Sequence, residues 1–452
     1  MDVFFVILLL ITELALLGIS WYWTNGDIIS PSAVTLALFI ISTACFLYDA
    51  KYWDVVFSFK AYMLFSMSFL LMVLTERFIS KHRISFHKIT NRYATNSTNK
   101  YILSIRKPFS ILLLMLFTAC SLLYVYRVYK SGMAHGALSL LTSIGVNKEI
   151  ADFDGFARLL YNLTRFAGYV YTMIFANNVF GCKQRIRKNL SCLWIIILSL
   201  IITFFSGQRS SIICFIFSII VATCIALYDS QRIGKKVDTK KLVRKLLIVG
   251  VIILAGFYLS ANIVKGTNIQ RDPVYYLTYY FGSTTALMGK IVSDPSICHQ
   301  PFVGYFGEKT FMGFWNTMNS WGIVSQPPAD RLWIRMGGTA TNAGNEYTFF
   351  CGPYIDFGFI GTLVFIITFY AIFAYIYYWK IRKAPVNKKR YTTISIYLFL
   401  YTLISMSFYQ DTIRSYSRPI NILYIIYLVV FCKMFLRIKE KEQSNGKTIR
   451  QI

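Results

Sequence analysis

Long apolar runs separated by short, mostly basic segments set the pattern of this chain. A helix needs about 17 to 25 apolar residues to cross a bilayer, and runs of that order recur along the sequence. They predict spans at 3–22, 31–49, 55–75, 108–126, 157–181, 191–206, 210–228, 246–262, 356–379, 392–409 and 420–436. We therefore expect an all-α, polytopic membrane helix bundle of about eleven transmembrane helices, within a range of about ten to twelve, that forms one integral membrane domain over residues 1–452.

One long polar stretch, 264–345, interrupts the apolar pattern. It holds 10 of the 26 glycines and 5 of the 10 prolines, the residues that most often mark turns and loops. It leads into the run T-N-A-G-N-E-Y-T-F-F-C-G-P-Y-I-D-F-G-F-I-G, Thr341 to Gly361, where we expect the chain to re-enter the membrane. The stretch is predicted to be a large loop of the same domain that contains short helices.

Charge sets the expected orientation. Five segments hold 31 of the 47 lysines and arginines, and with eleven spans they all fall on one side: 76–107, 182–190, 229–245, 380–391 and 433–452. Because Lys and Arg near span ends concentrate in cytoplasmic loops, that side is predicted to be cytoplasmic. The long loop and the N-terminus are then periplasmic, and the C-terminus is cytoplasmic.

The formal net charge of +27 does not indicate nucleic acid as a partner, because the basic residues lie in short loops between spans. Membrane topology and attraction to anionic lipids of the inner leaflet account for them. The sequence has no Walker motif, no H-E-x-x-H, no G-x-S-x-G and no glycine-rich nucleotide fingerprint. We therefore expect neither a cofactor nor a metal site.

Arginines on the outer face are the first candidates for chemistry. At the start of the fifth span, Arg158, Asn162, Arg165 and Tyr169 share one helical face. Arg165 lies about 10 Å below Arg158 at the helical rise per residue, and an arginine at that depth is typical of a water-filled cavity or a charged partner. Its alternative is a structural pairing with Glu13 or a backbone carbonyl.

Two short outer turns carry further cations. In S-G-Q-R-S-S, Gln208 and Arg209 precede a helix whose N-terminus favours anions, although an interfacial anchor explains them equally well. In the last outer loop, Asp411, Arg414 and Arg418 share a face, with a simple salt bridge as the alternative. Several guanidinium groups around one cavity suit a pyrophosphate or an anionic saccharide.

A reaction at this face also needs a proton acceptor. The candidates are His299, Glu308, Glu346 and Asp356, and the last two lie closest to the predicted re-entry. Asp356 is equally explained as a helix cap. Tyrosines and tryptophans around the long loop favour stacking on sugar rings or, more simply, an aromatic belt at the membrane surface.

The segment N-E-Y-T-F-F-C-G-P-Y-I-D-F-G-F-I-G, Asn345 to Gly361, resembles the corresponding region of the O-antigen polymerase (Wzy) family, and S-G-Q-R-S-S-I, Ser206 to Ile212, is similar to a turn common there. The resemblance implies a glycosyltransferase of the bacterial inner membrane. Its donor is a growing chain on undecaprenyl pyrophosphate, and its acceptor is a newly flipped repeat unit. Some members carry arginine and glycine at the spacing of Arg271 and Gly282.

On this reading, one set of residues binds the pyrophosphate or saccharide: Arg158, Arg165, Gln208, Arg209, Arg271, Arg414 and Arg418. The base is Asp356, Glu346 or His299. The expected partners are the lipid-linked oligosaccharide, membrane lipids, and a chain-length regulator and flippase of the same pathway. Two alternatives stay open: an O-antigen ligase, and a flippase or other transporter of lipid-linked oligosaccharides.

Overall fold

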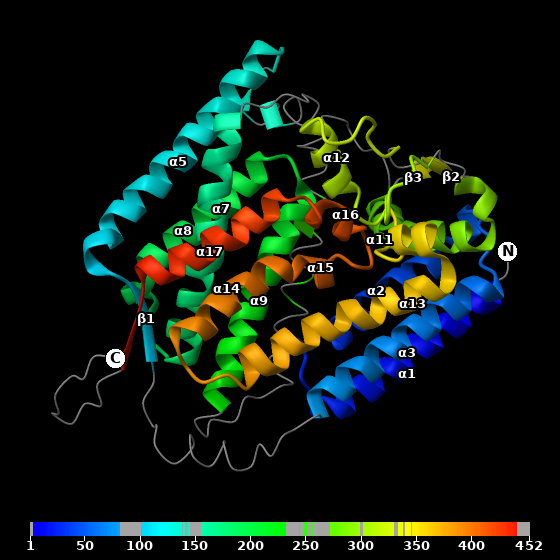
Figure 1. Cartoon of the computed structure of the whole chain (residues 1–452), viewed down its shortest axis with the longest axis horizontal. Coiled ribbons are helices and arrows are strands. Elements are labelled where there is room, and N and C mark those ends of the chain that lie inside the picture. Colours follow the sequence, from blue (N-terminus) through cyan, green and yellow to red (C-terminus); the bar gives the residue numbers. More distant parts are fainter. Residues whose placement is uncertain are drawn as a thin grey trace. The chain divides into compact units, whose positions relative to one another are not determined.

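The computed structural model describes residues 3–81, 101–137, 155–231, 272–298, 302–329, 333–337, 340–344 and 346–440, with isolated positions in 139–144 and 244–258. Helices make up most of the described residues, accompanied by four short strands (Figure 1). The all-α class predicted from the apolar runs is therefore confirmed.

Seven of the described helices are long and apolar enough to cross a bilayer, when the short turns that extend α2, α8 and α13 are included. They are α1 (Val3–Trp23), α2 (Pro31–Asp49), α3 (Phe59–Lys81), α5 (Lys107–Ala134), α8 (Leu190–Phe205), α9 (Arg209–Gln231) and α13 (Cys351–Tyr375). These helices confirm a membrane protein with several transmembrane helices.

The other four predicted spans differ. Helix α7 (Gly155–Ala176) covers most of 157–181 but is not among the seven, and α17 (Ile420–Phe435) is apolar but has only 16 residues. Residues 392–409 do not form one helix, because α14 (Lys388–Leu400) is followed by the separate turn α15 (Thr402–Ser405). The span predicted at 246–262 lies mostly outside the described residues.

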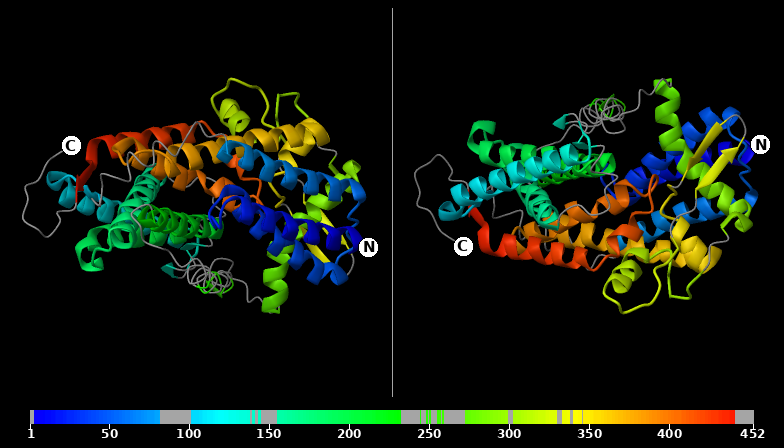
Figure 2. Two further views of the ribbon diagram at one scale, coloured as in Figure 1. Left: turned by 90° about the horizontal axis from the view of Figure 1, so that it is seen from below. Right: turned by 90° about the horizontal axis from the view of Figure 1, so that it is seen from above.

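The polar stretch 264–345 contains more regular structure than a loop with short helices. It holds α11 (Pro273–Ser293), a helix of 21 residues, then α12 (Met312–Ser320) and the paired strands β2 (Ile334–Gly337) and β3 (Ala340–Gly344). The strands are antiparallel and lie side by side (Figure 2). Apolar runs alone do not reveal α11, because its buried half is rich in glycine, serine and threonine.

Close packing against α2 holds α11. A Cβ atom on Gly282 would lie 2.5 Å from the backbone nitrogen of Phe46, so only glycine allows this approach. One turn further, the hydroxyls of Thr285 and Ser42 lie 2.7 Å apart. The polar stretch is thus fixed to the membrane helices through α11.

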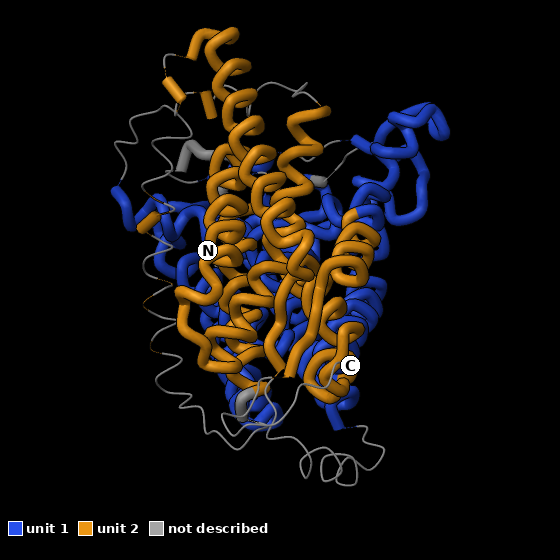
Figure 3. Tube along the Cα trace, turned by 90° about the vertical axis from the view of Figure 1, so that its left-hand side faces the viewer, with its two compact units in different colours: residues 1–82, 271–378, 402–423 blue, residues 83–270, 379–401, 424–452 orange. Residues whose placement is uncertain are grey.

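Two compact units divide the chain (Figure 3). Unit 1 comprises residues 1–82, 271–378 and 402–423, and unit 2 comprises 83–270, 379–401 and 424–452. Each unit combines segments that are distant in the sequence.

Unit 1 is built on α1, α2, α3 and α13. Helices α3 and α13 run in the same direction, because Lys60 lies over the Tyr354 ring at 5.7 Å while the Tyr378 hydroxyl donates to Glu76 at 2.6 Å. The end that carries Lys60 and Tyr354 also carries α11, and we name it the loop end of unit 1. In the buried middle, the Thr43 hydroxyl donates to Glu13 at 3.0 Å.

Unit 2 is built on α5, α7, α8, α9, α14 and α17. Strands β1 (Tyr101–Ile105) and β4 (Leu436–Glu440) pair antiparallel next to the start of α5 and the end of α17. Asn178 ties β1 to the end of α7, because its side chain accepts from the Leu103 amide at 2.9 Å and donates to the Leu103 carbonyl at 2.7 Å. We name this side of unit 2 the basic end.

Candidate functional site

Along the face of α7 that carries Arg158 and Arg165, the side chains become more buried with increasing residue number. Arg158 is exposed, Asn162 and Arg165 are half-buried, and Tyr169 is fully buried. The Asn162 amide donates to the Tyr424 hydroxyl at 2.8 Å, and the Tyr424 ring stacks on Phe166 at 4.2 Å. The face therefore runs from an exposed position into a packed interior within about three turns.

Arg165 lies between aromatic rings. Its guanidinium carbon is 5.6 Å from the centre of the Tyr161 ring and 5.9 Å from that of Phe166. Such contacts hold a flat cation in position. Glu13, the alternative partner considered for Arg165, belongs to unit 1 and accepts its hydrogen bond from Thr43 there.

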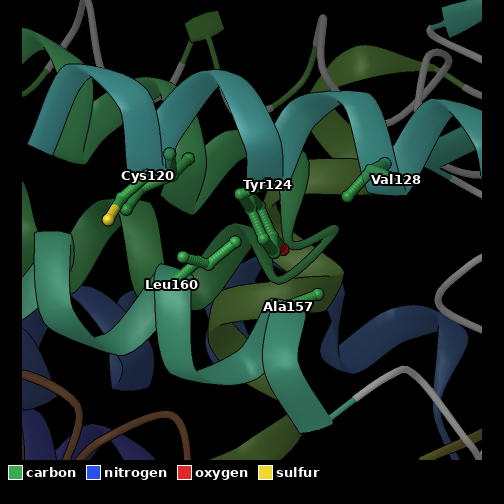
Figure 4. Close-up of a cluster of buried hydrophobic side chains, with 6 residues drawn as sticks. Cys120, Tyr124, Val128, Ala157 and Leu160 are labelled. Carbon is green, nitrogen blue, oxygen red and sulfur yellow. The ribbon is translucent and has the colours of Figure 1, made fainter. Parts of the chain in front are cut away.

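A small apolar cluster holds the first two turns of α7. Figure 4 shows Cys120 and Tyr124 of α5 facing Leu160 and Ala157 of α7, all of them buried. Deeper in α7, a Cβ atom on Gly168 would lie 2.4 Å from the Ser199 hydroxyl, and that hydroxyl donates to the Thr164 carbonyl at 3.1 Å. The arginines therefore stand on a rigid helix rather than on a loop.

The turn before α9 has the geometry of a tight helix start. Gly207 adopts a φ of +70°, which favours glycine, and Gln208 is exposed. The Ser211 hydroxyl donates to the Gln208 side-chain oxygen at 3.0 Å, which links the turn to the first residues of the helix. Arg209 is the first residue of α9, and its side chain lies outside the described part of the structure.

Helices α7 and α9 run parallel and bring their first turns to the same end of unit 2. Tyr169 packs on Phe215 with ring centres 5.3 Å apart, and further along the pair Gly181 lies next to Ala226. This register places Arg165 level with the first turn of α9, where Arg209 stands. The sequence-predicted cations Arg158, Arg165 and Arg209 therefore share one end of unit 2, opposite the basic end.

In unit 1, Asp356 ties the polar stretch to the start of α13. Its carboxylate accepts from the amides of Lys309 at 3.0 Å and Thr310 at 2.6 Å, and from the Thr310 hydroxyl at 2.6 Å. Gly358, two residues further, interrupts the helix with a φ of +66°. Asp356 lies within α13 and its carboxylate accepts from a distant segment, so it anchors that segment and is not the helix cap considered from the sequence. Its acid–base role stays a prediction.

Glu308 and Lys309 form a buried ion pair beside this anchor. The Lys309 ammonium lies 3.0 Å from Glu308 Oε1, and Oε2 accepts from the amides of Val303 at 2.8 Å and Gly304 at 3.2 Å. Desolvation alone would raise the pKa of Glu308, but the hydrogen bonds from Lys309 and the two amides outweigh it and lower the pKa. Glu308 is thus held as a carboxylate, which suits structure better than proton transfer.

The segment 410–419 also reaches this junction. A Cβ atom on Gly352 would lie 2.8 Å from Asp411 Oδ2 and 2.9 Å from Thr310 Cα, so Asp411 stands close to the loop that Asp356 anchors. Gly313 of α12 also has close neighbours, because a Cβ atom there would clash with the Arg414 carbonyl of α16 (Thr412–Tyr416) and with the Arg418 side chain just beyond it. Arg414 is half-buried and Arg418 is exposed.

The remaining candidates are less defined. Glu346 is half-buried just before the buried run that enters α13, where the Phe349 amide donates to the Ser407 carbonyl at 2.9 Å. Arg271 and His299 lie outside the described residues. Within the described residues, no three His, Cys, Asp or Glu side chains are grouped to hold a metal ion.

Sequence reasoning missed Lys309 and Thr310. Their partners Glu308 and Asp356 were both considered, but the anchor joins residues that lie 46 or 47 positions apart. No local motif marks such a pairing.

The candidates thus form two groups. Arg158, Arg165, Gln208 and Arg209 belong to unit 2, while Glu346, Asp356, Arg414 and Arg418 belong to unit 1. The first group can hold an anion, and the second combines carboxylates and cations around an anchored loop. In comparisons with known proteins, the chain matches no family model, no curated protein and no solved structure.

Proposed function

We propose that the protein polymerises oligosaccharide repeat units carried on undecaprenyl pyrophosphate, at the periplasmic face of the bacterial inner membrane. The observation that carries the proposal is the shared position of Arg158, Arg165 and Arg209 at one end of unit 2, reached through the parallel helices α7 and α9. Guanidinium groups near a helix N-terminus suit a pyrophosphate, which carries several charges in a small volume.

In the proposed reaction, a hydroxyl at the non-reducing end of the acceptor repeat unit attacks the anomeric carbon of the donor chain. A new glycosidic bond forms, and the bond between that carbon and the pyrophosphate oxygen breaks. Undecaprenyl pyrophosphate leaves with the bonding electron pair, and the hydroxyl proton passes to a base. Arg165 and Arg209 stabilise the charge that grows on the leaving oxygen.

The candidates for the base are Asp356, Glu346 and His299, and hydrogen bonds already engage the carboxylate of Asp356. Asp356 already accepts hydrogen bonds from Lys309 and Thr310, and Glu308 is paired with Lys309. A carboxylate whose oxygens are engaged in this way is a weaker proton acceptor. Glu346→Gln tests Glu346 as the base: a base at this position predicts a lower rate of chain growth without weaker donor binding.

An O-antigen ligase would use the same donor and the same anion site, and it differs only in transferring the whole chain to another acceptor. A flippase would move the donor without breaking a bond. The products separate the three functions: a ladder of longer chains for the polymerase, a single capped acceptor for the ligase, and unaltered donor on the other leaflet for the flippase.

The direct test is reconstitution of the purified protein in liposomes with a defined undecaprenyl-pyrophosphate repeat unit. Arg165→Lys keeps the charge but removes the flat, two-pronged donor, and it is expected to slow chain growth roughly 100-fold, as the loss of one transition-state donor does. Lys130→Gln is the matched control, because Lys130 is exposed on α5. Equal rates in wild type and Arg165→Lys would refute the pyrophosphate role of Arg165.

A further inference from the structure

The basic end of unit 2 joins four segments of the chain into one rigid surface. Strands β1 and β4 pair there, and Asn178 binds the backbone of Leu103 through two hydrogen bonds. The Arg106 amide donates to the Phe435 carbonyl at 2.9 Å, and the Lys388 ammonium donates to the Lys433 carbonyl at 2.5 Å. The start of α5, the start of α14 and the end of α17 are therefore fixed against one another.

Cations dominate this surface. The segments 101–107, 183–189, 383–390 and 433–440 contain one acidic residue, Glu440. We define the basic platform by the cations next to the ribbon: Arg106, Lys107, Lys388, Lys433, Arg437 and Lys439. Arg106, Lys107, Lys433 and Lys439 are exposed.

The cations of the platform are crowded. Partial burial of the Lys388 ammonium and, next in size, the positive charge of Arg106 lower the pKa of Lys388. Like charges held together on a rigid backbone repel one another, and an anion that binds between them relieves this repulsion. The position of Lys388 also has a purely structural explanation, because its ammonium donates to the Lys433 carbonyl in the last turn of α17. Such capping does not explain Arg437 and Lys439, which lie on β4 beyond the end of α17.

Exposed apolar side chains lie directly beside the platform. The start of α5 is in contact with the end of α17, with ring centres of Phe109 and Phe435 at 5.1 Å and of Phe117 and Phe431 at 6.1 Å. Next to this seam, Ile111 of α5 is 68% exposed and Met434 of α17 is 50% exposed. The same surface thus presents cations and, within one or two turns of helix, apolar side chains.

We propose that the basic platform is a binding site for an anionic phospholipid, whose phosphate group contacts Arg106, Lys388 and Lys433 while its acyl chain lies along α5 and α17. Helix α5 is long and apolar enough to span a bilayer, so its apolar flank faces lipid tails and the cations at its start lie at the level of the headgroups. A phospholipid matches both parts of the surface, since one molecule carries a charged head and an apolar tail. The site lies at the opposite end of unit 2 from Arg165 and is independent of the proposed reaction.

The test measures lipid binding to the purified full-length protein by native mass spectrometry and by thermal unfolding in nanodiscs. The nanodiscs contain phosphatidylcholine alone or with phosphatidylglycerol. The variant removes three cations as Arg106→Gln, Lys388→Gln and Lys433→Gln. Its control removes three cations elsewhere, as Lys51→Gln, Arg127→Gln and Lys130→Gln, all exposed in the structure.

Wild type and control are expected to retain phosphatidylglycerol and to unfold at higher temperature when it is present. The platform variant is expected to lose affinity by about fivefold for each cation removed, and its unfolding temperature in phosphatidylcholine alone shows whether it folds. If it does not fold, Lys433→Gln is read alone, with Lys433→Arg as rescue.

Equal retention of phosphatidylglycerol in the platform variant and the control would overturn the proposal. Stabilisation of the detergent-purified protein by inorganic phosphate to the same extent as by the lipid would overturn it too, because the ligand would then be a free phosphate rather than a phospholipid.

Discussion

Replacing Asp356 by alanine leaves three donors of the polar stretch without their acceptor: the amides of Lys309 and Thr310 and the Thr310 hydroxyl. Thr310 is fully buried and Lys309 is 5% exposed, so water cannot readily take the place of the carboxylate. A hydrogen bond to a charged group contributes about 1.5 to 3 kcal/mol. Because the loop can relax and recover part of this energy, the loss of three such bonds is expected to lower the free energy of unfolding by about 3 to 6 kcal/mol. Asp356→Asn keeps one acceptor oxygen and is expected to lose about half as much.

Hydrogen exchange followed by mass spectrometry measures this loss locally. Peptides that cover 305–311 are expected to lose most of their protection in Asp356→Ala and part of it in Asp356→Asn. Asp294→Ala is the matched control, because Asp294 is exposed and its carboxylate accepts from the amide and hydroxyl of Ser296 in its own turn. Unchanged protection in Asp356→Ala would refute the anchor. Complete loss of activity in Asp356→Asn with full protection would assign Asp356 to the reaction instead.

Three further predictions follow from single contacts. Because the pKa of Glu308 is lowered in the folded protein, its carboxylate contributes its full stability above the usual pKa of 4.5 and loses it as the pH falls through the lowered pKa. Glu308→Gln is therefore expected to make the unfolding temperature less dependent on pH in this acid range. Equal pH dependence of the unfolding temperature in wild type and variant would contradict the ion pair. Gly282→Ala is expected to lower the free energy of unfolding by about 1 to 3 kcal/mol through overpacking, which a lower unfolding temperature would report. Gly18→Ala, where a Cβ atom would meet no other atom within 4 Å, is expected to be neutral or stabilising. Arg390→Ala removes the donor that lies 2.7 Å from the Asp229 carboxylate, and it is expected to lower the free energy of unfolding by about 3 to 5 kcal/mol. A loss under about 1 kcal/mol, as exposed ion pairs give, would contradict a buried pair.

Sequence patterns predict the ends of several helices closely. The span expected at 31–49 is α2 (Pro31–Asp49), because Ser30 accepts from the Ala33 amide as an N-cap and Pro31 stands in the first turn. The expected 3–22 is α1 (Val3–Trp23), which ends before the turn at Gly26. Where apolarity and end signals agree, the chain needs no tertiary information to specify the element.

Elements that depend on distant contacts were not predicted. Helix α11 is defined by the close approach of Gly282 to α2, a property of two surfaces rather than of one sequence window. The pairing of β1 with β4 brings together Tyr101 and Glu440, which lie far apart in the sequence. The same holds for the candidate site, since the pattern around Asp356 suggests a cap or a base but cannot show that Thr310 occupies its carboxylate.

Helical spacing was more informative for the arginines. The pattern at Arg158, Asn162 and Arg165 correctly indicates one face that passes from exposed to half-buried positions. What the pattern could not give is the parallel packing of α7 on α9, which brings Arg209 to the same end of the unit. That packing depends on Gly168, whose missing side chain leaves room for Ser199 and Phe215.

Chain growth by purified protein tests the central claim most directly. The measurement is the length distribution of products formed in liposomes from one defined undecaprenyl-pyrophosphate repeat unit, compared between wild type, Arg165→Lys and Lys130→Gln. The account predicts a ladder of products for wild type and Lys130→Gln, and a rate reduced roughly 100-fold for Arg165→Lys. A wild-type protein that is folded and holds the donor but forms no product longer than a single repeat would contradict it.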